Sequence, residues 1–215
     1  MGSPRSKVEV KGFEARFYDQ LLDLLTLGQY PRLLRKVFSQ MSIAEGDSII
    51  DLGSGTGRNA CYMLKKAGRN ARLVGLDINE DMIKKARKKC RDYPNAEFIN
   101  MRIEEPIPFE SEFDIAFISF VLHGFEDYDR VKIVKNVSKA LKPGGRFYIF
   151  DYNEFDVDKA PFYVRFFIRK LECPLAEEFI NLDLKKFLAG FGFSDFKEWT
   201  YAGRVIRLLE ATFNR

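Results

Sequence analysis

Apolar and polar positions follow two different periodicities between residues 48 and 151. Short apolar runs, typical of buried strands, alternate with segments whose apolar residues recur at helical spacing. The expected strands cover 48–52, 72–76, 96–100, 113–119 and 145–151, and the expected helices cover 57–67, 80–92 and 128–141. This alternation predicts an α/β fold with a doubly wound, mostly parallel sheet and helices on both of its faces.

The segments on either side of this region add helices and two more strands. Apolar residues at helical spacing in 13–42 predict two helices. Near the C-terminus, 195–201 and 204–213 have the pattern of strands, joined by a connection short enough for a hairpin. We therefore expect a seven-stranded sheet whose last strand is antiparallel.

Residues that end or begin helices agree with these boundaries. Gly68 is expected to close the helix at 57–67, and Asn79 to cap the helix at 80–92. The run Pro-Gly-Gly at 143–145 is expected to end the helix at 128–141.

Composition and charge indicate a globular protein. Of its 215 residues, 46% are hydrophobic and 31% are charged, which excludes a disordered chain. No apolar run approaches the roughly 20 residues that span a bilayer, and residues 1–11 lack the apolar core of a signal peptide, so we expect a cytoplasmic protein. The net charge of +4 is mild, and the basic run at 84–91 favours a solvated helix face over a nucleic-acid site.

The three cysteines suggest neither a disulfide framework nor a metal site. Cys61, Cys90 and Cys173 are odd in number and scattered, and no pair has metal-ligand spacing. We therefore expect three reduced thiols and no metal.

A glycine-rich turn follows the first expected strand. The strand ends in Asp51, and Gly53, Gly55 and Gly57 follow at alternate positions; Asp77 ends the second strand. Ligands of open α/β sheets bind beyond the carboxyl ends of the strands, where glycines admit a ligand to the backbone and an acid can accept ribose hydroxyls. The pattern predicts a nucleoside-bearing ligand.

Details of the turn argue against a dinucleotide. Arg58 stands where the third glycine of a pyrophosphate fingerprint would fall, and no Walker-type Gly-Lys-Ser/Thr is present. Asp51 would repel a phosphate but would suit a cationic amine or sulfonium. The expected ligand is a nucleoside with a positively charged, amino-acid-like tail.

Four segments resemble, in order, the motifs of class I S-adenosylmethionine-dependent methyltransferases. They are IIDLGSGTG at 49–57, VGLDIN at 74–79, FDIAFIS at 113–119 and LKPGGRF at 141–147. The chain is similar, over residues 13–152, to the small-molecule and quinone C-methyltransferases of the ubiquinone/menaquinone type. The resemblance implies a Rossmann-like fold, S-adenosylmethionine as methyl donor and S-adenosylhomocysteine as product.

The resemblance also assigns cofactor contacts to matching positions. It implies that the loop holds the methionine part, that an acid takes the ribose, that two apolar side chains flank the adenine and that the end of the fourth strand lines the path to the methyl group. The residues of the loop are Asp51, Gly53, Ser54, Gly55 and Gly57, and the acid is Asp77. The side chains that flank the adenine are Ile78 and Met82, and the residues at the end of the fourth strand are Ser119 and Phe120. Tyr18 matches an N-terminal Tyr-Asp element that closes over the cofactor; the alternative is an ordinary amphipathic helix residue.

One position departs from the family pattern. Arg102 stands where the family carries an Asp near the adenine amino group, and an arginine cannot accept a hydrogen bond from that group. Arg102 and Ile103 are therefore expected near the adenine, with a backbone carbonyl, Glu104 or apolar packing in place of the missing acid.

His123 is the only histidine and lies at the mouth of the expected site. It is a candidate general base, although methyl transfer to an activated nucleophile needs mainly positioning. The alternative is that it lines the pocket or caps the next segment.

The acceptor side is less specific. Aromatic residues in 155–179 suggest an apolar lid over a small, apolar or aromatic acceptor, or a helix packed on the core, with a weaker signal for contact with a membrane surface. We expect a single domain, 1–215, comprising an N-terminal helical lid at 13–45, a cofactor-binding core at 46–152, a helical substrate lid at 153–192 and a C-terminal hairpin at 193–215. Methylation of RNA or protein and a non-catalytic cofactor-binding domain are the competing functions, and Arg58 disfavours a nicotinamide oxidoreductase.

Overall fold

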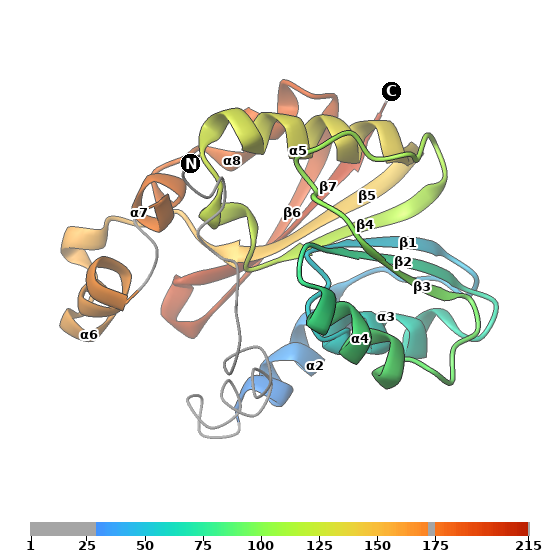
Figure 1. Ribbon diagram of the computed structural model, residues 1–215. Coiled ribbons are helices and arrows are strands. Elements are labelled where there is room, and N and C mark those ends of the chain that lie inside the picture. Colours follow the sequence, from blue (N-terminus) through green and yellow to red (C-terminus); the bar gives the residue numbers. More distant parts are fainter. Residues whose placement is uncertain (1–28, 172–174, 215) are drawn as a thin grey trace, which may run out of the picture.

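The computed structural model describes residues 29–171 and 175–214, which form a seven-stranded sheet with helices on both faces (Figure 1). The strands are β1 (Ser48–Leu52), β2 (Arg72–Asp77), β3 (Ala96–Asn100), β4 (Phe113–Ser119), β5 (Leu141–Tyr152), β6 (Phe193–Tyr201) and β7 (Ile206–Phe213). Their order in the sheet is β3-β2-β1-β4-β5-β7-β6. The first five are parallel, and β7 runs antiparallel to both of its neighbours. The predicted doubly wound, mostly parallel sheet is therefore confirmed.

Helices cover the sheet as two layers and continue beyond one end of it (Figure 1). One face carries α2 (Tyr30–Gln40), α3 (Arg58–Ala67) and α4 (Glu80–Lys89), and the other carries α5 (Asp127–Ala140) and α8 (Leu184–Ala189). The short helices α6 (Phe162–Phe166) and α7 (Leu175–Ile180) follow the end of β5. Among the described residues, none of these helices has the length and apolar character needed to cross a bilayer.

Alternation along the strands divides the core into two clusters. Ile50 and Ile118 belong to the cluster beneath α5, whereas Ile49 and Phe117 belong to the cluster beneath α2, α3 and α4. Successive side chains of a strand point to opposite faces of a sheet. Because both faces are covered, β1 is buried almost throughout, as a central parallel strand must be.

The expected helix caps are confirmed at two places and wrong at a third. The side chain of Asn79 accepts hydrogen bonds from the backbone amides of Asp81 and Met82 at the start of α4, and Gly68 (φ +80°) closes α3. The run at 143–145 does not follow a helix end, because α5 stops at Ala140 and β5 already begins at Leu141. The run instead forms an irregularity inside β5, where the register against β4 shifts.

The prediction of three reduced thiols is also wrong. Cys61 on α3 and Cys90, which follows α4, form a disulfide with their Cα atoms 5.8 Å apart. Their separation of 29 residues hid the pairing, because only the packing of α3 beside α4 brings the two positions together. Cys173 lies outside the described residues.

Candidate cofactor and acceptor site

Three of the predicted site residues lie together at one edge of the sheet. Leu52 at the end of β1 is in register with Leu76 of β2 and with Ile118 of β4. The next residues, Gly53, Asp77 and Ser119, therefore lie side by side at the carboxyl ends of three neighbouring strands. This edge includes the switch point between β1 and β4, where the direction of strand order reverses and where ligands of such sheets bind.

The glycine loop takes a conformation that requires its glycines. Gly53, Gly55 and Gly57 have φ values of +75°, +53° and +74°, which side chains rarely tolerate. A Cβ on Gly53 would lie 2.6 Å from Val121, and a Cβ on Gly57 would lie 2.9 Å from the backbone of Ala86. A Cβ on Gly55 would meet nothing within 4 Å among the described residues. The loop is thus packed at both ends and open in the middle, so a ligand can approach its backbone there.

Asp77 is held in place by the backbone on both sides. Its Oδ2 accepts a hydrogen bond from the amide of Gly55 at 2.8 Å, and its Oδ1 accepts one from the amide of Asn79 at 2.8 Å. A carboxylate oxygen can accept more than one hydrogen bond. Asp77 can therefore also accept hydrogen bonds from vicinal hydroxyls, as the ribose assignment requires.

Asp51 is a buried acid at the site, and one of its oxygen atoms lacks a hydrogen-bond partner among the described residues. It is 1% exposed, and neither its Oδ2 nor Oγ of the neighbouring Ser54 has a hydrogen-bond partner among the described residues. Burial, and secondarily the charge of Asp77, raises the pKa of Asp51 to about 8. A bound phosphate would add to the electrostatic repulsion between Asp51 and Asp77, whereas a bound cationic group would reduce it. The arrangement fits the ammonium and sulfonium groups of S-adenosylmethionine and does not fit a pyrophosphate.

The residues expected around the adenine are only partly gathered at this edge. Ile78 is 37% exposed directly after β2, and Met82 is buried on the first turn of α4. Arg102 pairs with the buried carboxylate of Glu104, from its Nε to Oε1 at 2.5 Å. Glu104, the suggested substitute for the missing acid, is therefore already engaged, and Ile103 belongs to the hydrophobic core beneath α5.

The end of β4 has an unusual backbone. Phe120 has a φ of +51°, a left-handed conformation that costs energy for any residue other than glycine. Its amide donates to the carbonyl of Phe150 at 2.9 Å, and its ring contacts Phe150 and Tyr152 edge to face. The bend turns the chain across the sheet edge at the position assigned to the methyl path. Tyr18 lies outside the described residues.

His123 forms a buried pair with an acid that the sequence analysis did not single out. Its Nδ1 lies 2.7 Å from Oδ1 of Asp151, and the two residues are 3% and 0% exposed. Asp151 also accepts hydrogen bonds from the amides of His123 and Tyr152. An orienting carboxylate on Nδ1 is the arrangement that prepares Nε2 of a histidine for proton transfer. The position of Asp151 at the carboxyl end of a central strand was a usable signal.

Arg130 of α5 fixes the turn that carries His123 through hydrogen bonds. This fully buried residue of α5 donates to the carbonyls of Leu122 and His123, at 3.3 and 3.4 Å. It also reaches Glu178 on α7 at 2.9 Å. One arginine thereby joins α5, the turn that carries His123 and α7. Its place on an ordinary amphipathic helix gave no sequence signal for this role.

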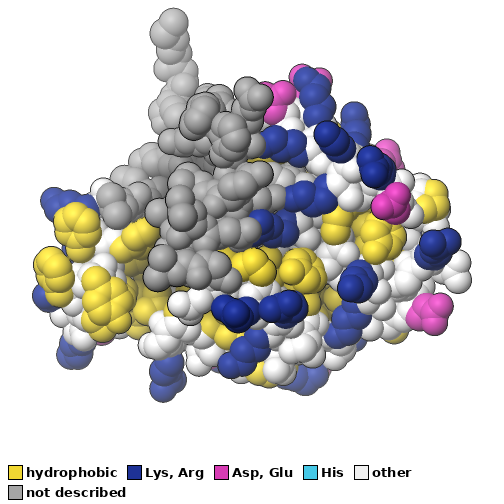
Figure 2. All heavy atoms as spheres, turned by 90° about the horizontal axis from the view of Figure 1, so that it is seen from below, with side chains coloured by type: hydrophobic (Ala, Val, Ile, Leu, Met, Phe, Trp, Pro, Cys, Tyr) yellow, Lys and Arg dark blue, Asp and Glu magenta, His cyan; other side chains and the backbone are white. Residues whose placement is uncertain are grey.

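Four aromatic side chains in and just after α6 are exposed. Phe162, Tyr163, Phe166 and Phe167 have exposed fractions of 74%, 71%, 50% and 45%. Figure 2 shows hydrophobic side chains gathered at the left end of the molecule, where α6 lies in Figure 1. The other side of the segment after β5 does contact the core, since Val164 of α6 packs against the core cluster and Ile168 and Phe179 belong to it.

Comparisons with known proteins agree with this geometry. Residues 49–145 match the profile of a family described as "Methyltransferase domain". The ubiquinone/menaquinone biosynthesis C-methyltransferase UbiE of Proteus mirabilis is 30% identical over 141 residues, which make up 64% of this chain and 55% of that protein. A demethylmenaquinone methyltransferase of Lactobacillus johnsonii is 32% identical over 135 residues, 61% of this chain and 54% of that protein. The chain thus spans about half the length of these curated relatives.

A solved structure extends the likeness beyond the family match. A SAM-dependent methyltransferase from Aquifex aeolicus aligns with a TM-score of 0.64 and 21% identity, over 84% of this chain and 89% of that chain. At this identity the likeness concerns the fold. Together with the family match, it confirms the resemblance found in the sequence motifs. Residues 49–145 of this chain thus match a methyltransferase domain family, and the chain has the Rossmann-like fold of such an enzyme.

Proposed function

We propose that the protein is an S-adenosylmethionine-dependent methyltransferase that acts on a small apolar or aromatic acceptor in the cytoplasm. The observation that carries the proposal is the buried carboxyl of Asp51 beside the open glycine loop. Its Oδ2 lacks a partner among the described residues, and its pKa is raised to about 8 by burial and by Asp77. A cationic amino-acid tail bound here would supply the missing partner and lower that pKa again.

Each residue of the edge then has a part in holding the cofactor. The backbone of Gly53 to Gly57, with Asp51 and Ser54, would hold the methionine part, and Asp77 would accept the ribose hydroxyls. Ile78 and Met82 would flank the adenine. When bound, S-adenosylmethionine supplies a methyl group on a positively charged sulfur for attack by a nucleophile.

His123 and Asp151 would serve the acceptor. Asp151 holds the Nδ1–H of His123, so Nε2 takes the proton that an acidic acceptor hydroxyl or carbon loses as it attacks. Asp151 would stabilise the imidazolium that forms. Arg130 keeps the turn at His123 in position from the far side. The pair would therefore raise the nucleophilicity of the acceptor at the moment of transfer.

The aromatic surface of α6 supports an apolar or aromatic acceptor. Its exposed rings belong to the chain segment between β5, which carries Asp151, and α7, which packs against the turn carrying His123. Exposed apolar patches of this kind mark sites for apolar ligands or surfaces. The names of two relatives, a ubiquinone/menaquinone biosynthesis C-methyltransferase and a demethylmenaquinone methyltransferase, favour a quinol or phenol as the acceptor class.

Calorimetry with three ligands tests the cofactor assignment. We expect S-adenosylmethionine and S-adenosylhomocysteine to bind and NAD not to bind. Asp77→Ala should weaken S-adenosylhomocysteine by about 1–3 kcal/mol, because hydrogen-bonding groups lose their partners. Asp81→Ala, an exposed acid four residues along, is the matched control and should leave affinity unchanged.

Three outcomes would contradict the proposal in different ways. Binding of NAD without S-adenosylhomocysteine would exclude the cofactor. Unchanged affinity of Asp77→Ala would exclude the ribose assignment. Binding without turnover of quinols, phenols and small acids would favour the non-catalytic alternative, and turnover of RNA or protein alone would exclude a small acceptor.

A further inference from the structure

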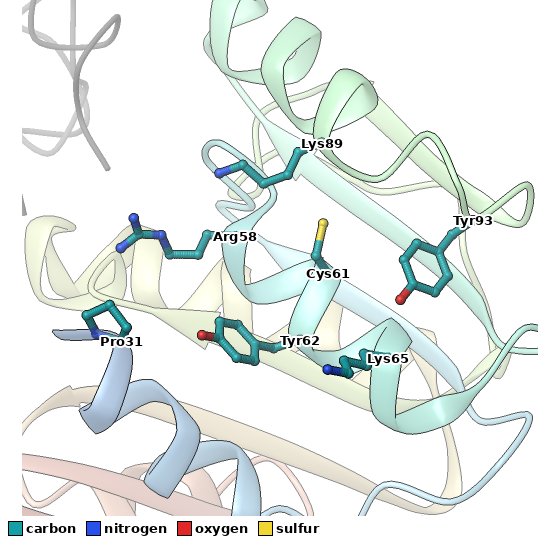
Figure 3. Close-up of a pocket in the computed structure, with 7 residues that line it drawn as sticks. All are labelled: Pro31, Arg58, Cys61, Tyr62, Lys65, Lys89 and Tyr93. Carbon is teal, nitrogen blue, oxygen red and sulfur yellow. The ribbon is translucent and has the colours of Figure 1, made fainter. Parts of the chain in front are cut away.

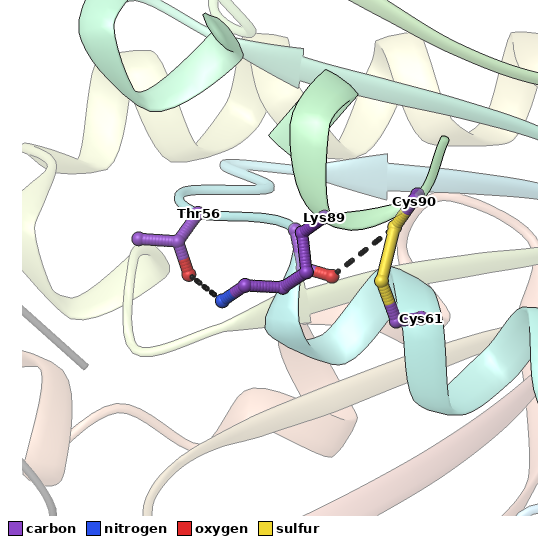
Figure 4. Close-up of a disulfide and its surroundings, with 5 residues drawn as sticks. Thr56, Cys61, Lys89 and Cys90 are labelled. Carbon is purple, nitrogen blue, oxygen red and sulfur yellow. Dashed lines mark hydrogen bonds between the residues drawn. A yellow bond between two sulfur atoms is a disulfide. The ribbon is translucent and has the colours of Figure 1, made fainter. Parts of the chain in front are cut away.

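The disulfide joins the two helices that flank the glycine loop. Cys61 lies in the first turns of α3, which begins directly after the loop, and Cys90 follows the last residue of α4 (Figure 4). Helix α4 itself begins just after Asp77, the proposed ribose acceptor. The bond therefore connects the two chain segments that lead away from the cofactor edge.

Three further contacts tie the end of α4 to the loop. Ala86 packs so closely on Gly57 that a Cβ there would lie 2.9 Å from its backbone. Nζ of Lys89 donates to Oγ1 of Thr56 at 3.1 Å, and Sγ of Cys90 lies 3.6 Å from the carbonyl oxygen of Gly57 (Figure 4). That same oxygen accepts the amide of Cys61. Breaking or forming the S–S bond should therefore alter the contacts of Gly57, the last glycine of the loop.

One side of the disulfide can be reached from outside. Cys61 lines a cavity of about 460 Å³, together with Pro31, Arg58, Tyr62, Lys65, Lys89 and Tyr93 (Figure 3). Cys90 is 2% exposed. The cationic side chains around the cavity favour the approach of an anionic thiolate. An incoming thiol can therefore attack the sulfur of Cys61, with Cys90 as the leaving group.

We propose that the Cys61–Cys90 disulfide is a reversible redox site, reduced through this cavity by dithiols, and that its state determines how firmly the glycine loop holds its ligand. Disulfides of cytoplasmic proteins are usually of this redox-sensing kind. With the bond formed, α3 and α4 are fixed together. The glycine loop, which leads into α3 and packs against Ala86 of α4, is then preorganised. With the bond broken, the end of α4 loses its covalent link to α3 and keeps its packing and hydrogen bonds, including that of Arg87 to the carbonyl of Phe98. The statement about ligand binding rests on the cofactor proposed earlier, whereas the redox site does not.

The exchange balances with a dithiol as the reductant. Its thiolate attacks Sγ of Cys61, and the electron pair of the S–S bond leaves with Sγ of Cys90, which takes up a proton. The second thiol of the reductant then displaces Cys61 as a thiol. The protein gains two electrons and two protons in all, and the reductant becomes a disulfide. The new thiol of Cys90 can donate to the carbonyl of Gly57.

The test compares the full-length chain in two redox states. A Cys173→Ser background leaves Cys61 and Cys90 as the only cysteines. Oxidised protein and protein treated with dithiothreitol are compared by thiol alkylation with mass spectrometry, hydrogen exchange of residues 53–57, thermal unfolding and calorimetry with S-adenosylhomocysteine. Cys61→Ala/Cys90→Ala in the same background is the matched control.

We expect no alkylated thiols in the oxidised protein and two after reduction. Reduction should speed exchange in the loop, lower Tm by roughly 5–15 °C and weaken S-adenosylhomocysteine about fivefold or more. The double alanine variant should match the reduced protein with or without dithiothreitol.

Two results would overturn the proposal. One is a bond that dithiothreitol does not reduce in the native protein. The other is loop exchange and ligand affinity that are the same in both redox states. If S-adenosylhomocysteine binds in neither state, the proposed cofactor is wrong, and the alkylation and exchange measurements still decide the redox site.

Discussion

The cofactor end and the acceptor end of the site are built in opposite ways. At the cofactor end, buried Asp51 and Ser54 carry oxygen atoms without partners among the described residues, around a loop of glycines. At the acceptor end, the buried polar groups of His123, Asp151 and Arg130 are hydrogen-bonded to one another's segments. An unpaired buried polar group costs free energy. We therefore infer that a ligand completes the first end, whereas the polar groups of the second are already paired within the protein.

The largest expected effect tests whether the assembled end is catalytic. His123→Ala should lower kcat by about 10²- to 10⁴-fold, the usual contribution of a general base, while the Kd of S-adenosylhomocysteine stays unchanged. Asp151→Asn should lower kcat and shift the pH–rate profile, because Asp151 positions the imidazole and stabilises its charged form. Turnover of His123→Ala at the normal rate would show that the pair is structural, and so would an unchanged pH profile for Asp151→Asn.

The second prediction concerns the packing of the glycine loop. Gly57→Ala should destabilise the protein by about 2–4 kcal/mol, from left-handed strain and from the clash with Ala86. Gly144→Ala is the matched control, because Gly144 has a similar φ of +78° and a Cβ there meets nothing within 4 Å among the described residues. It should cost only about 1–2 kcal/mol. Urea unfolding measures both, and equal losses would exclude close packing of the loop on α4.

The third prediction uses the titration of Asp51. A ligand ammonium favours the carboxylate, so affinity for S-adenosylhomocysteine should rise with pH, by up to about tenfold per unit, until the pKa of about 8 is passed. Binding at pH 7 should release a proton, which calorimetry in two buffers of different ionisation enthalpy detects. Asp51→Asn should abolish both effects. Affinity that falls as pH rises towards 8 would exclude a cation at Asp51.

The carboxyl group of Asp51 should also make the stability of the ligand-free protein depend on pH. Its pKa is raised from 3.8 to about 8 in the folded protein, so the folded state binds the proton more tightly than the unfolded state. The stabilisation from Asp51 is fully present below pH 4 and is lost as pH rises through 8. Bound S-adenosylhomocysteine should remove this loss.

The smallest expected effect on stability comes from substitutions of the exposed aromatic residues of α6. Phe162→Ser combined with Phe166→Ser should change the free energy of unfolding by less than about 0.5 kcal/mol, because both side chains are exposed. The same variant should raise KM for an apolar acceptor and leave the affinity for S-adenosylhomocysteine unchanged. Unchanged KM would show that α6 does not face the acceptor.

Sequence patterns predicted the two ends of the site unequally. The strand ends that carry Gly53, Asp77 and Ser119 were predicted because apolar runs and glycine spacing are local properties of the chain. Asp151 and Arg130 were missed because their roles depend on contacts with residues 28 and 7 positions away in the sequence. The error at residues 143–145 had a local cause, since Pro and Gly interrupt helices and also form irregularities within strands.

The sequence by itself determined the order of strands and helices, the glycine loop and the acid that faces it. These features follow from the periodicity of apolar residues and from the backbone freedom of glycine. Both are local properties that depend only on residues close together in the chain. Only the tertiary structure decided that Asp51 is left without a partner among the described residues, that His123 meets Asp151 and that Cys61 meets Cys90. Those facts depend on how strands and helices pack together, and burial and hydrogen bonding between distant segments are what give the groups their chemistry.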